Sequence, residues 1–190
     1  MASQNYYYFV ATLPWLNYGD KPPTSSEEFR ELCLALLHPS DADLIRYCRY
    51  DPKLAVETVK PTGSDFIDLL MARERTLNLN LAYLRAARLK RPSPGDPPHD
   101  VPRAEAVAKA AFEMNDPLEA ELYIDQARWG ALDAMVGIDS FGVNNVYAYL
   151  LKLQLLERRQ CFSVERGTAG YRERYDAILN EYNSKGKEDI

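Results

Sequence analysis

Apolar residues recur three, four and seven positions apart along most of this chain, which is the spacing of one face of an α-helix. The longest such stretch begins at Ser64 or Asp65 and runs to Arg91 without glycine or proline, so we also consider a break near Leu77. The pattern predicts an all-α protein. Its helices are expected at about residues 25–38, 41–50, 65–91, 104–114, 117–136, 143–159 and 171–182.

Capping residues mark where two of these helices begin. Ser25 and Glu28 have the spacing of a capping box, in which each side chain binds the backbone N–H of the other residue. Asn115, Asp116 and Pro117 combine a cap with a proline near the first helical position. These signals are local in the sequence and therefore fix both helix starts closely.

The chain divides at its N-terminal segment and at a cluster of prolines. Tyr6 to Ala11 is rich in residues that favour strands, but it is isolated, so we expect residues 1–24 to form an extended aromatic arm. Residues 92–102 contain five prolines, which predicts an exposed linker. The linker would join two helical lobes, residues 25–91 and 103–190.

The predicted helix at residues 117–136 carries an apolar stripe and an acidic cluster. The stripe, which we expect to be buried, consists of Leu118, Leu122, Trp129, Leu132 and Val136. The acidic cluster consists of Glu113, Asp116, Glu119, Glu121 and Asp125. Such carboxylates could form a catalytic pair like that of a glycosidase. We interpret them instead as residues that stabilise a helix N-terminus and form a solvated face.

Charge is unevenly distributed along the 190 residues, whose formal net charge is −5. Residues 65–91 carry six basic and three acidic side chains, whereas residues 113–139 carry seven acidic and one basic side chain. The overall charge excludes a globally basic nucleic-acid binder but leaves room for a local basic patch. That patch contains Arg85, Arg88, Lys90 and Arg91. It could contact an anionic partner, or it could simply offset the helix dipole.

The sequence contains little material for catalysis. It has two histidines and none of the motifs of phosphate-binding loops, dinucleotide-binding folds, serine hydrolases or zinc proteases. Cys33, His38 and Cys48 match no zinc spacing, and we expect these cysteines and Cys161 to be reduced and mostly buried. We therefore expect no catalytic residue, no cofactor and no metal.

Two further features bear on location and partners. No stretch approaches the roughly 20 apolar residues that span a bilayer, and the N-terminus does not resemble a secretory signal. We expect a cytoplasmic protein whose association with a membrane is only indirect.

The sequence contains 13 tyrosines, which is unusually many. The triplet Tyr6–Tyr8 either packs on the body of the protein or forms a surface for a partner.

Several segments together resemble an uncharacterised bacterial family that is encoded beside the genes of V-type ATPases. They are the sequence YYYFVATLP at residues 6–14 and the residues 74–88, 143–158 and 167–178. Thr12 stands where that family usually has glycine. The second half also resembles the C subunit of bacterial and archaeal V/A-type ATPases, the counterpart of the eukaryotic d subunit. This second likeness rests on Asp125, Arg128 and Trp129 within residues 118–132, and on Ile138 and Asp139 before Asn144 and Asn145.

The resemblance implies helical lobes that connect a rotor stalk to a membrane ring, without catalytic residues. It implies rotor and membrane-ring subunits of a V-type ATPase as partners, no nucleic acid, and a peripheral location at the inner membrane. The alternative is a free-standing helical adaptor or regulator that binds anionic partners through the basic helix end. The candidate interface residues are Tyr6, Tyr7, Tyr8, Arg85, Arg88, Arg91, Arg128, Asn144 and Asn145.

Overall fold

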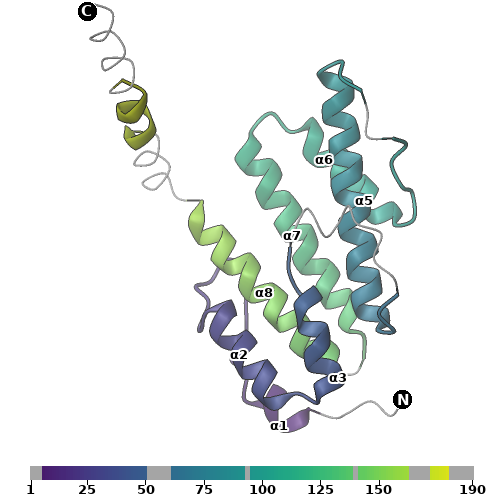
Figure 1. Cartoon of the computed structure of the whole chain (residues 1–190), viewed down its shortest axis with the longest axis vertical. Helices are drawn as coiled ribbons and strands as arrows, with labels where there is room; N and C mark the ends of the chain where they lie inside the picture. The colour runs from purple at the N-terminus through teal and green to yellow at the C-terminus, as the bar shows by residue number, and fades with distance from the viewer. Residues whose placement is uncertain (1–5, 51–60, 93–94, 139–140, 163–171, 180–190) are drawn as a thin grey trace, which may run out of the picture. The chain divides into compact units, whose positions relative to one another are not determined.

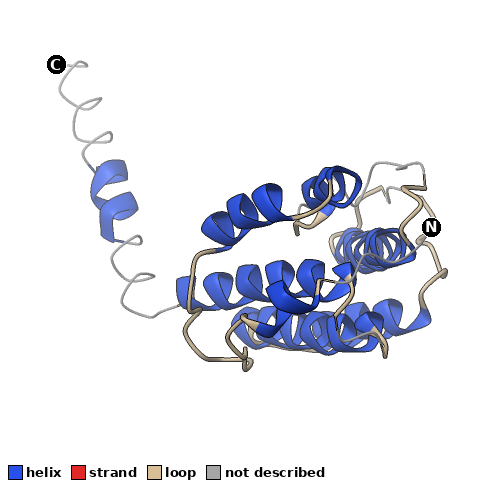
Figure 2. Ribbon diagram, turned by 90° about the horizontal axis from the view of Figure 1, so that it is seen from below, coloured by secondary structure: helices blue, strands red, loops and turns tan. Residues whose placement is uncertain are grey.

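The computed structural model describes residues 6–50, 61–92, 95–138, 141–162 and 172–179. All regular structure among these residues is helical, which confirms the all-α prediction (Figure 1, Figure 2). The chain forms two compact units, Met1–Glu157 and Arg158–Ile190. In the second unit, residues 172–179 form a helix whose residues are all exposed. No helix in the described part of the chain is long and apolar enough to cross a bilayer.

Several helices begin where the capping signals predict. The elements are α1 (Tyr7–Ala11), α2 (Ser26–Leu36), α3 (Pro39–Ala42), the 3-10 helix η1 (Asp43–Tyr47), α5 (Asp65–Arg88), α6 (Pro102–Glu113), α7 (Pro117–Val136) and α8 (Val143–Cys161). Ser25 and Glu28 form the predicted capping box, Ser64 caps α5, and Asp116 caps α7. No break occurs in α5 near Leu77.

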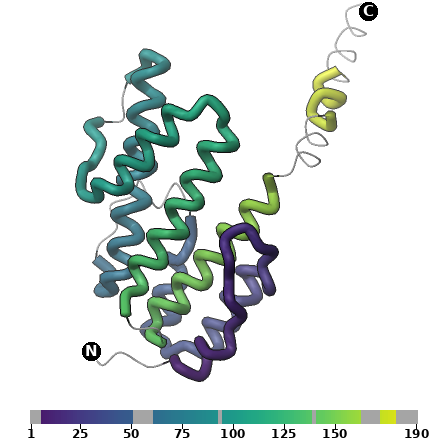
Figure 3. Tube along the Cα trace, turned by 180° about the vertical axis from the view of Figure 1, so that it is seen from behind, coloured from purple at the N-terminus to yellow at the C-terminus, as the bar shows by residue number. Residues whose placement is uncertain are grey.

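The expectation of an extended N-terminal arm is wrong for residues 7–11, which form α1. A short helix pairs some of its own backbone groups, whereas an isolated strand would leave them without protein partners. Contacts with the body hold this turn of helix in place. The Tyr6 N–H donates to the Phe141 carbonyl at 2.9 Å, and the rings of Phe9 and Phe29 stack 5.8 Å apart. The chain that follows α1 then passes alongside α8 (Figure 3).

The segment after α2 also differs from expectation. The sequence predicts one helix capped by Ser40 or Asp41, but the chain forms α3 and then η1. The cap is His38, because Pro39 already occupies the first helical position. The predicted connection at residues 52–63 lies mainly outside the described residues.

The described residues of the first unit contain two apolar clusters. The larger contains, among others, Phe29, Ile45, Phe66, Leu132, Tyr147 and Leu153. The smaller contains Leu77, Leu81, Ala104, Ala108, Ala111 and Ile124. Each cluster combines residues from both sides of residues 92–102. The proline-containing segment therefore connects α5 to α6, but it does not separate two cores.

Charged residues separate the two clusters along α5 and α7. We call these residues the polar layer: Arg73, Glu74, Asp125 and Arg128. On α5 they lie between Leu70 of the larger cluster and Leu77 of the smaller one. On α7 they lie between Ile124 of the smaller cluster and Leu132 of the larger one. The interior therefore changes from apolar to charged and back to apolar along both helices.

Candidate functional site

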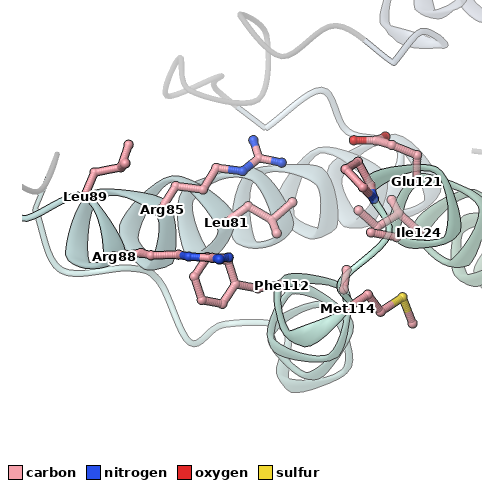
Figure 4. A pocket seen from close by; sticks show the side chains of 11 residues that line it. Leu81, Arg85, Arg88, Leu89, Phe112, Met114, Glu121 and Ile124 are labelled. Carbon is pink, nitrogen blue, oxygen red and sulfur yellow. The ribbon is translucent and has the colours of Figure 1, made fainter.

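A groove of about 390 Å³ opens where the end of α5, the end of α6 and the start of α7 meet (Figure 4). We call it the α5–α7 groove. Its floor includes Leu81 and Ile124, which are buried. Leu89, Phe112 and Met114 also line it, and Leu89 is 61% exposed. The groove thus presents apolar side chains to solvent at one end of the smaller cluster.

The two sides of the α5–α7 groove carry opposite charges. Arg85 and Arg88 line the α5 side, both are exposed, and the Arg88 guanidinium carbon lies 5.8 Å from the centre of the Phe112 ring. Glu121 extends from α7 on the other side (Figure 4). Within the described ranges, neither arginine forms an ion pair with a carboxylate. Their charges are therefore available to a bound partner.

The polar layer joins the two helices that form the sides of this groove. The Arg128 guanidinium donates from Nε to Glu74 Oε1 at 3.0 Å and from Nη2 to Glu74 Oε2 at 2.7 Å. Its Nη1 donates to Asp125 Oδ1 at 3.0 Å. Arg73 adds a contact to the same helix, because its Nη2 donates to the Ala127 carbonyl at 3.0 Å. Two-point pairing of an arginine with a carboxylate fixes geometry as well as charge.

The surroundings of Arg128 keep it charged. Burial lowers the pKa of its guanidinium, but the neighbouring Glu74 and Asp125 carboxylates more than offset this, and the resulting pKa is raised. The three side chains are at most 8% exposed. The space beside them is too small to hold a water molecule. The polar layer is therefore a closed contact that braces α5 against α7.

Tyr50 covers one side of the polar layer. Its ring centre lies 4.9 Å from the Arg128 guanidinium carbon, which is a cation–π contact. Its hydroxyl is enclosed and makes no hydrogen bond within the described part of the chain. Burial, followed by the charge of Glu74, raises the pKa of Tyr50 well above its ordinary value.

We expect Tyr50→Phe to leave the free energy of unfolding at pH 7 unchanged or to raise it by up to about 1 kcal/mol, because the lost hydroxyl donates no hydrogen bond to the described residues. The folded pKa of Tyr50 lies above the unfolded value of about 10. Above that pH the unfolded state loses the Tyr50 proton first, so the free energy of unfolding of the natural protein falls as pH rises, and below that pH Tyr50 has no such effect. Urea unfolding at about pH 7 and pH 10.5 should therefore show a shallower alkaline loss in the variant.

The matched control is Tyr8→Phe, since Tyr8 is 87% exposed. This change should alter neither the neutral nor the alkaline free energy of unfolding. A loss of more than about 1 kcal/mol at pH 7 in Tyr50→Phe would show that the hydroxyl makes a stabilising hydrogen bond, contrary to this expectation.

The N-terminal tyrosines, predicted as interface residues, have different surroundings. Tyr6 donates from its hydroxyl to Asp41 Oδ2 at 2.5 Å, which holds it against the body. The Tyr7 ring lies 4.6 Å from the Phe141 ring, and Tyr8 is largely exposed. Of the three, Tyr8 presents the most surface to a partner.

The other candidate interface residues lie on or beside α5 and in the first turn of α8, apart from Arg128 on α7. Arg85 and Arg88 meet in the α5–α7 groove, whereas Arg91 is exposed just beyond the end of α5 and does not line it. Asn144 and Asn145 are partly buried in the first turn of α8. The structure therefore brings only Arg85 and Arg88 together in one site.

Two expectations about α7 need correction. Arg128 is expected from the sequence at an interface with a partner, but it is 7% exposed and is paired inside the chain. Asp125 is expected on a solvated acidic face, but it is 0% exposed and binds Arg128. The charge of a residue is misleading here, because the sequence does not distinguish a buried charged residue in an ion pair from a solvated one.

Glu74 is the residue of this region that sequence reasoning missed. It lies four residues after Leu70 and three before Leu77, so it falls on the apolar face of α5. Arg128 lies four residues before the buried Leu132, so it falls on the apolar face of α7. Opposite charges on the apolar faces of two helices are the signal that could have predicted this pair.

The cysteines behave mainly as expected. Burial raises the pKa of the Cys33 thiol to about 12 and also raises that of Cys48, so both stay protonated near neutral pH. Cys161 is exposed, and none of the three forms a disulfide. In the described part of the chain, no three histidine, cysteine or acidic side chains gather as a metal site would require.

Part of the chain matches a known protein family. Residues 99–182, less than half of the chain, match a protein family described as "Protein of unknown function (DUF2764)". No curated protein matches the chain, and no solved structure does. The matched residues include all of α6, α7 and α8, and thus the α7 side of the groove but not the arginines of α5.

Proposed function

We propose that this protein is a non-catalytic subunit or accessory of a bacterial V-type ATPase, which couples or stabilises the rotor stalk and the membrane ring. The observation that carries the proposal is the combination of a braced helix pair with an open groove at its end. The polar layer ties α5 to α7 in a closed contact. The α5–α7 groove then offers an apolar floor and two exposed arginines to another protein.

The sequence resemblance is what favours this particular complex. The segments that resemble ATPase-associated proteins include Glu74, Asp125 and Arg128. These residues meet in the polar layer, although 54 positions separate Glu74 from Arg128. A part that transmits force between other subunits needs such internal contacts, because closely packed interiors joined by charge-assisted hydrogen bonds resist deformation.

The test uses a bacterium that encodes this protein beside a V-type ATPase. A tagged copy should recover rotor and membrane-ring subunits from detergent-solubilised membranes. Deleting the gene should reduce ATP-driven ion pumping in membrane vesicles more than it reduces ATP hydrolysis, because coupling would be impaired. Intact complexes that lack the protein, together with full pumping after deletion, would overturn the proposal.

The exposed basic helix end favours one second candidate, a free-standing adaptor or regulator that binds an anionic partner. Arg88 and Arg91 are both exposed, so substituting them tests whether the basic helix end binds an anionic partner. Binding to anionic vesicles or to nucleic acid should then weaken steeply with salt and should be abolished in the double variant Arg88→Ala with Arg91→Ala. Binding that is unaffected by salt or by both substitutions would exclude this candidate.

A further inference from the structure

We infer that the α5–α7 groove binds an amphipathic helix of a partner protein, with the apolar stripe of that helix on the groove floor and its acidic flank toward Arg85 and Arg88. The inference rests on the proposed function in that it names the chemistry of the partner. It concerns a surface that none of the comparisons assigns. Three properties of the groove support it: its apolar floor, the charge of its α5 side and the opposite charge of its α7 side.

The floor of the groove fits an apolar stripe. Leu81 and Ile124 belong to the smaller apolar cluster, so the groove is continuous with the protein interior. Leu89 and Phe112 extend this apolar surface outward, and Leu89 is 61% exposed. A helix whose apolar side chains recur every three or four residues can cover such a floor, as in other complexes where a helix lies in a groove.

The α5 side of the groove fits an acidic flank. Arg85 and Arg88 are exposed, three residues apart on α5, and no carboxylate of the described residues forms an ion pair with either. Arg88 packs its guanidinium over Phe112, so an acidic side chain could bind the guanidinium while apolar atoms cover the ring. Charge and apolar surface are thus adjacent in one site.

The floor of the groove argues against a polyanion. Glu121 extends from α7, and its carboxylate points toward the Arg85 guanidinium rather than into a uniformly basic surface (Figure 4). A nucleic acid or an anionic bilayer presents negative charge across its whole contact surface and would place phosphates against the apolar floor. An amphipathic helix can place its acidic residues on one flank only. A protein helix is therefore the occupant that matches both sides.

The experiment uses the full chain and synthetic labelled helical peptides of about 18 residues, followed by fluorescence anisotropy. The first probe has a leucine stripe with glutamates on one flank and alanine and glutamine elsewhere. The second replaces the glutamates with lysines, and the third replaces the leucines with serines. We expect saturable binding of the first probe, and binding of the other two weaker by about tenfold or more.

Charge reversal identifies the site. Arg85→Glu with Arg88→Glu should weaken binding of the glutamate probe by about tenfold or more and should strengthen binding of the lysine probe. The matched control is Lys90→Glu with Arg91→Glu, an equal charge change at exposed residues outside the groove. It should change binding by less than about twofold. Leu89→Ser, which removes an exposed apolar side chain from the groove, should also weaken binding of the glutamate probe.

Several results would overturn the inference. They are no saturable binding of the glutamate probe at millimolar concentration, equal effects of the two charge reversals, or preferred binding of phosphatidylglycerol vesicles or an oligonucleotide. Circular dichroism checks that each variant is folded. If the arginine variant unfolds, Leu89→Ser tests the groove instead.

Recovery of the ATPase by the Arg85→Glu, Arg88→Glu variant would show that the groove inference fails while the proposed function stands. Binding of the glutamate probe without any association with the ATPase would show that the groove inference stands while the proposed function fails.

Discussion

Replacing Arg128 with methionine is expected to lower the free energy of unfolding by about 3–5 kcal/mol. The substitution removes both hydrogen bonds to Glu74 and the one to Asp125, and it leaves two carboxylates in an interior that is at most 8% exposed. Methionine replaces much of the apolar volume, so the loss would report the uncompensated charge rather than a cavity. Urea unfolding followed by circular dichroism measures it.

Two further variants separate charge from packing. Arg91→Met makes the same chemical change at an exposed position and should alter the free energy of unfolding by less than about 0.5 kcal/mol. The quadruple variant Arg73→Met, Glu74→Leu, Asp125→Leu, Arg128→Met removes all four charges of the polar layer and should recover most of the loss, because well-packed apolar residues can replace buried ion pairs. A loss below about 1 kcal/mol in Arg128→Met alone would mean that the polar layer is solvated.

Leu132→Ala is expected to lower the free energy of unfolding by about 2–5 kcal/mol, whereas Leu118→Ala should change it by less than about 0.5 kcal/mol. The two leucines belong to the same predicted stripe of α7. In the folded chain, however, Leu132 is 1% exposed in the larger cluster and Leu118 is 43% exposed in the first turn of the helix. Truncation at Leu132 therefore leaves a cavity, and truncation at Leu118 does not.

Thermal and urea unfolding of the two variants under identical conditions provide the comparison. Because both replace leucine with alanine in one helix, helix propensity changes equally in both and cancels from the difference. Equal losses in the two variants would mean that the first turn of α7 packs against the body as closely as its last turns do.

Helix starts could be predicted because their causes are local. The Ser25 hydroxyl accepts from the Glu28 N–H at 3.1 Å, and the Ser25 N–H donates to the Glu28 carboxylate at the same distance. Asp116 likewise accepts from the Leu118 N–H at 2.8 Å. Partners two or three residues apart are visible in the sequence, and the resulting helices have the expected type and order.

Contacts between helices could not be predicted in the same way. The single stripe assigned to α7 assumes that one face meets one core, but this helix contributes Ile124 to one cluster and Leu132 to another. The charges of Asp125 and Arg128 depend on Glu74, which lies on a different helix. The groove could be foreseen only as a basic helix end, because its floor comes from α6 and α7 as well as α5 and is assembled by folding.

The position of the polar layer between two apolar clusters has a mechanical consequence. Apolar surfaces tolerate many relative placements, because leucine against leucine is favourable at several offsets. If α5 shifted along α7 by one helical turn of about 5.4 Å, however, Arg128 would face apolar residues and Glu74 would lose its partner. The buried charges therefore fix the axial register of the two helices. A force along their length must separate an ion pair in a dry interior before the helices can slip.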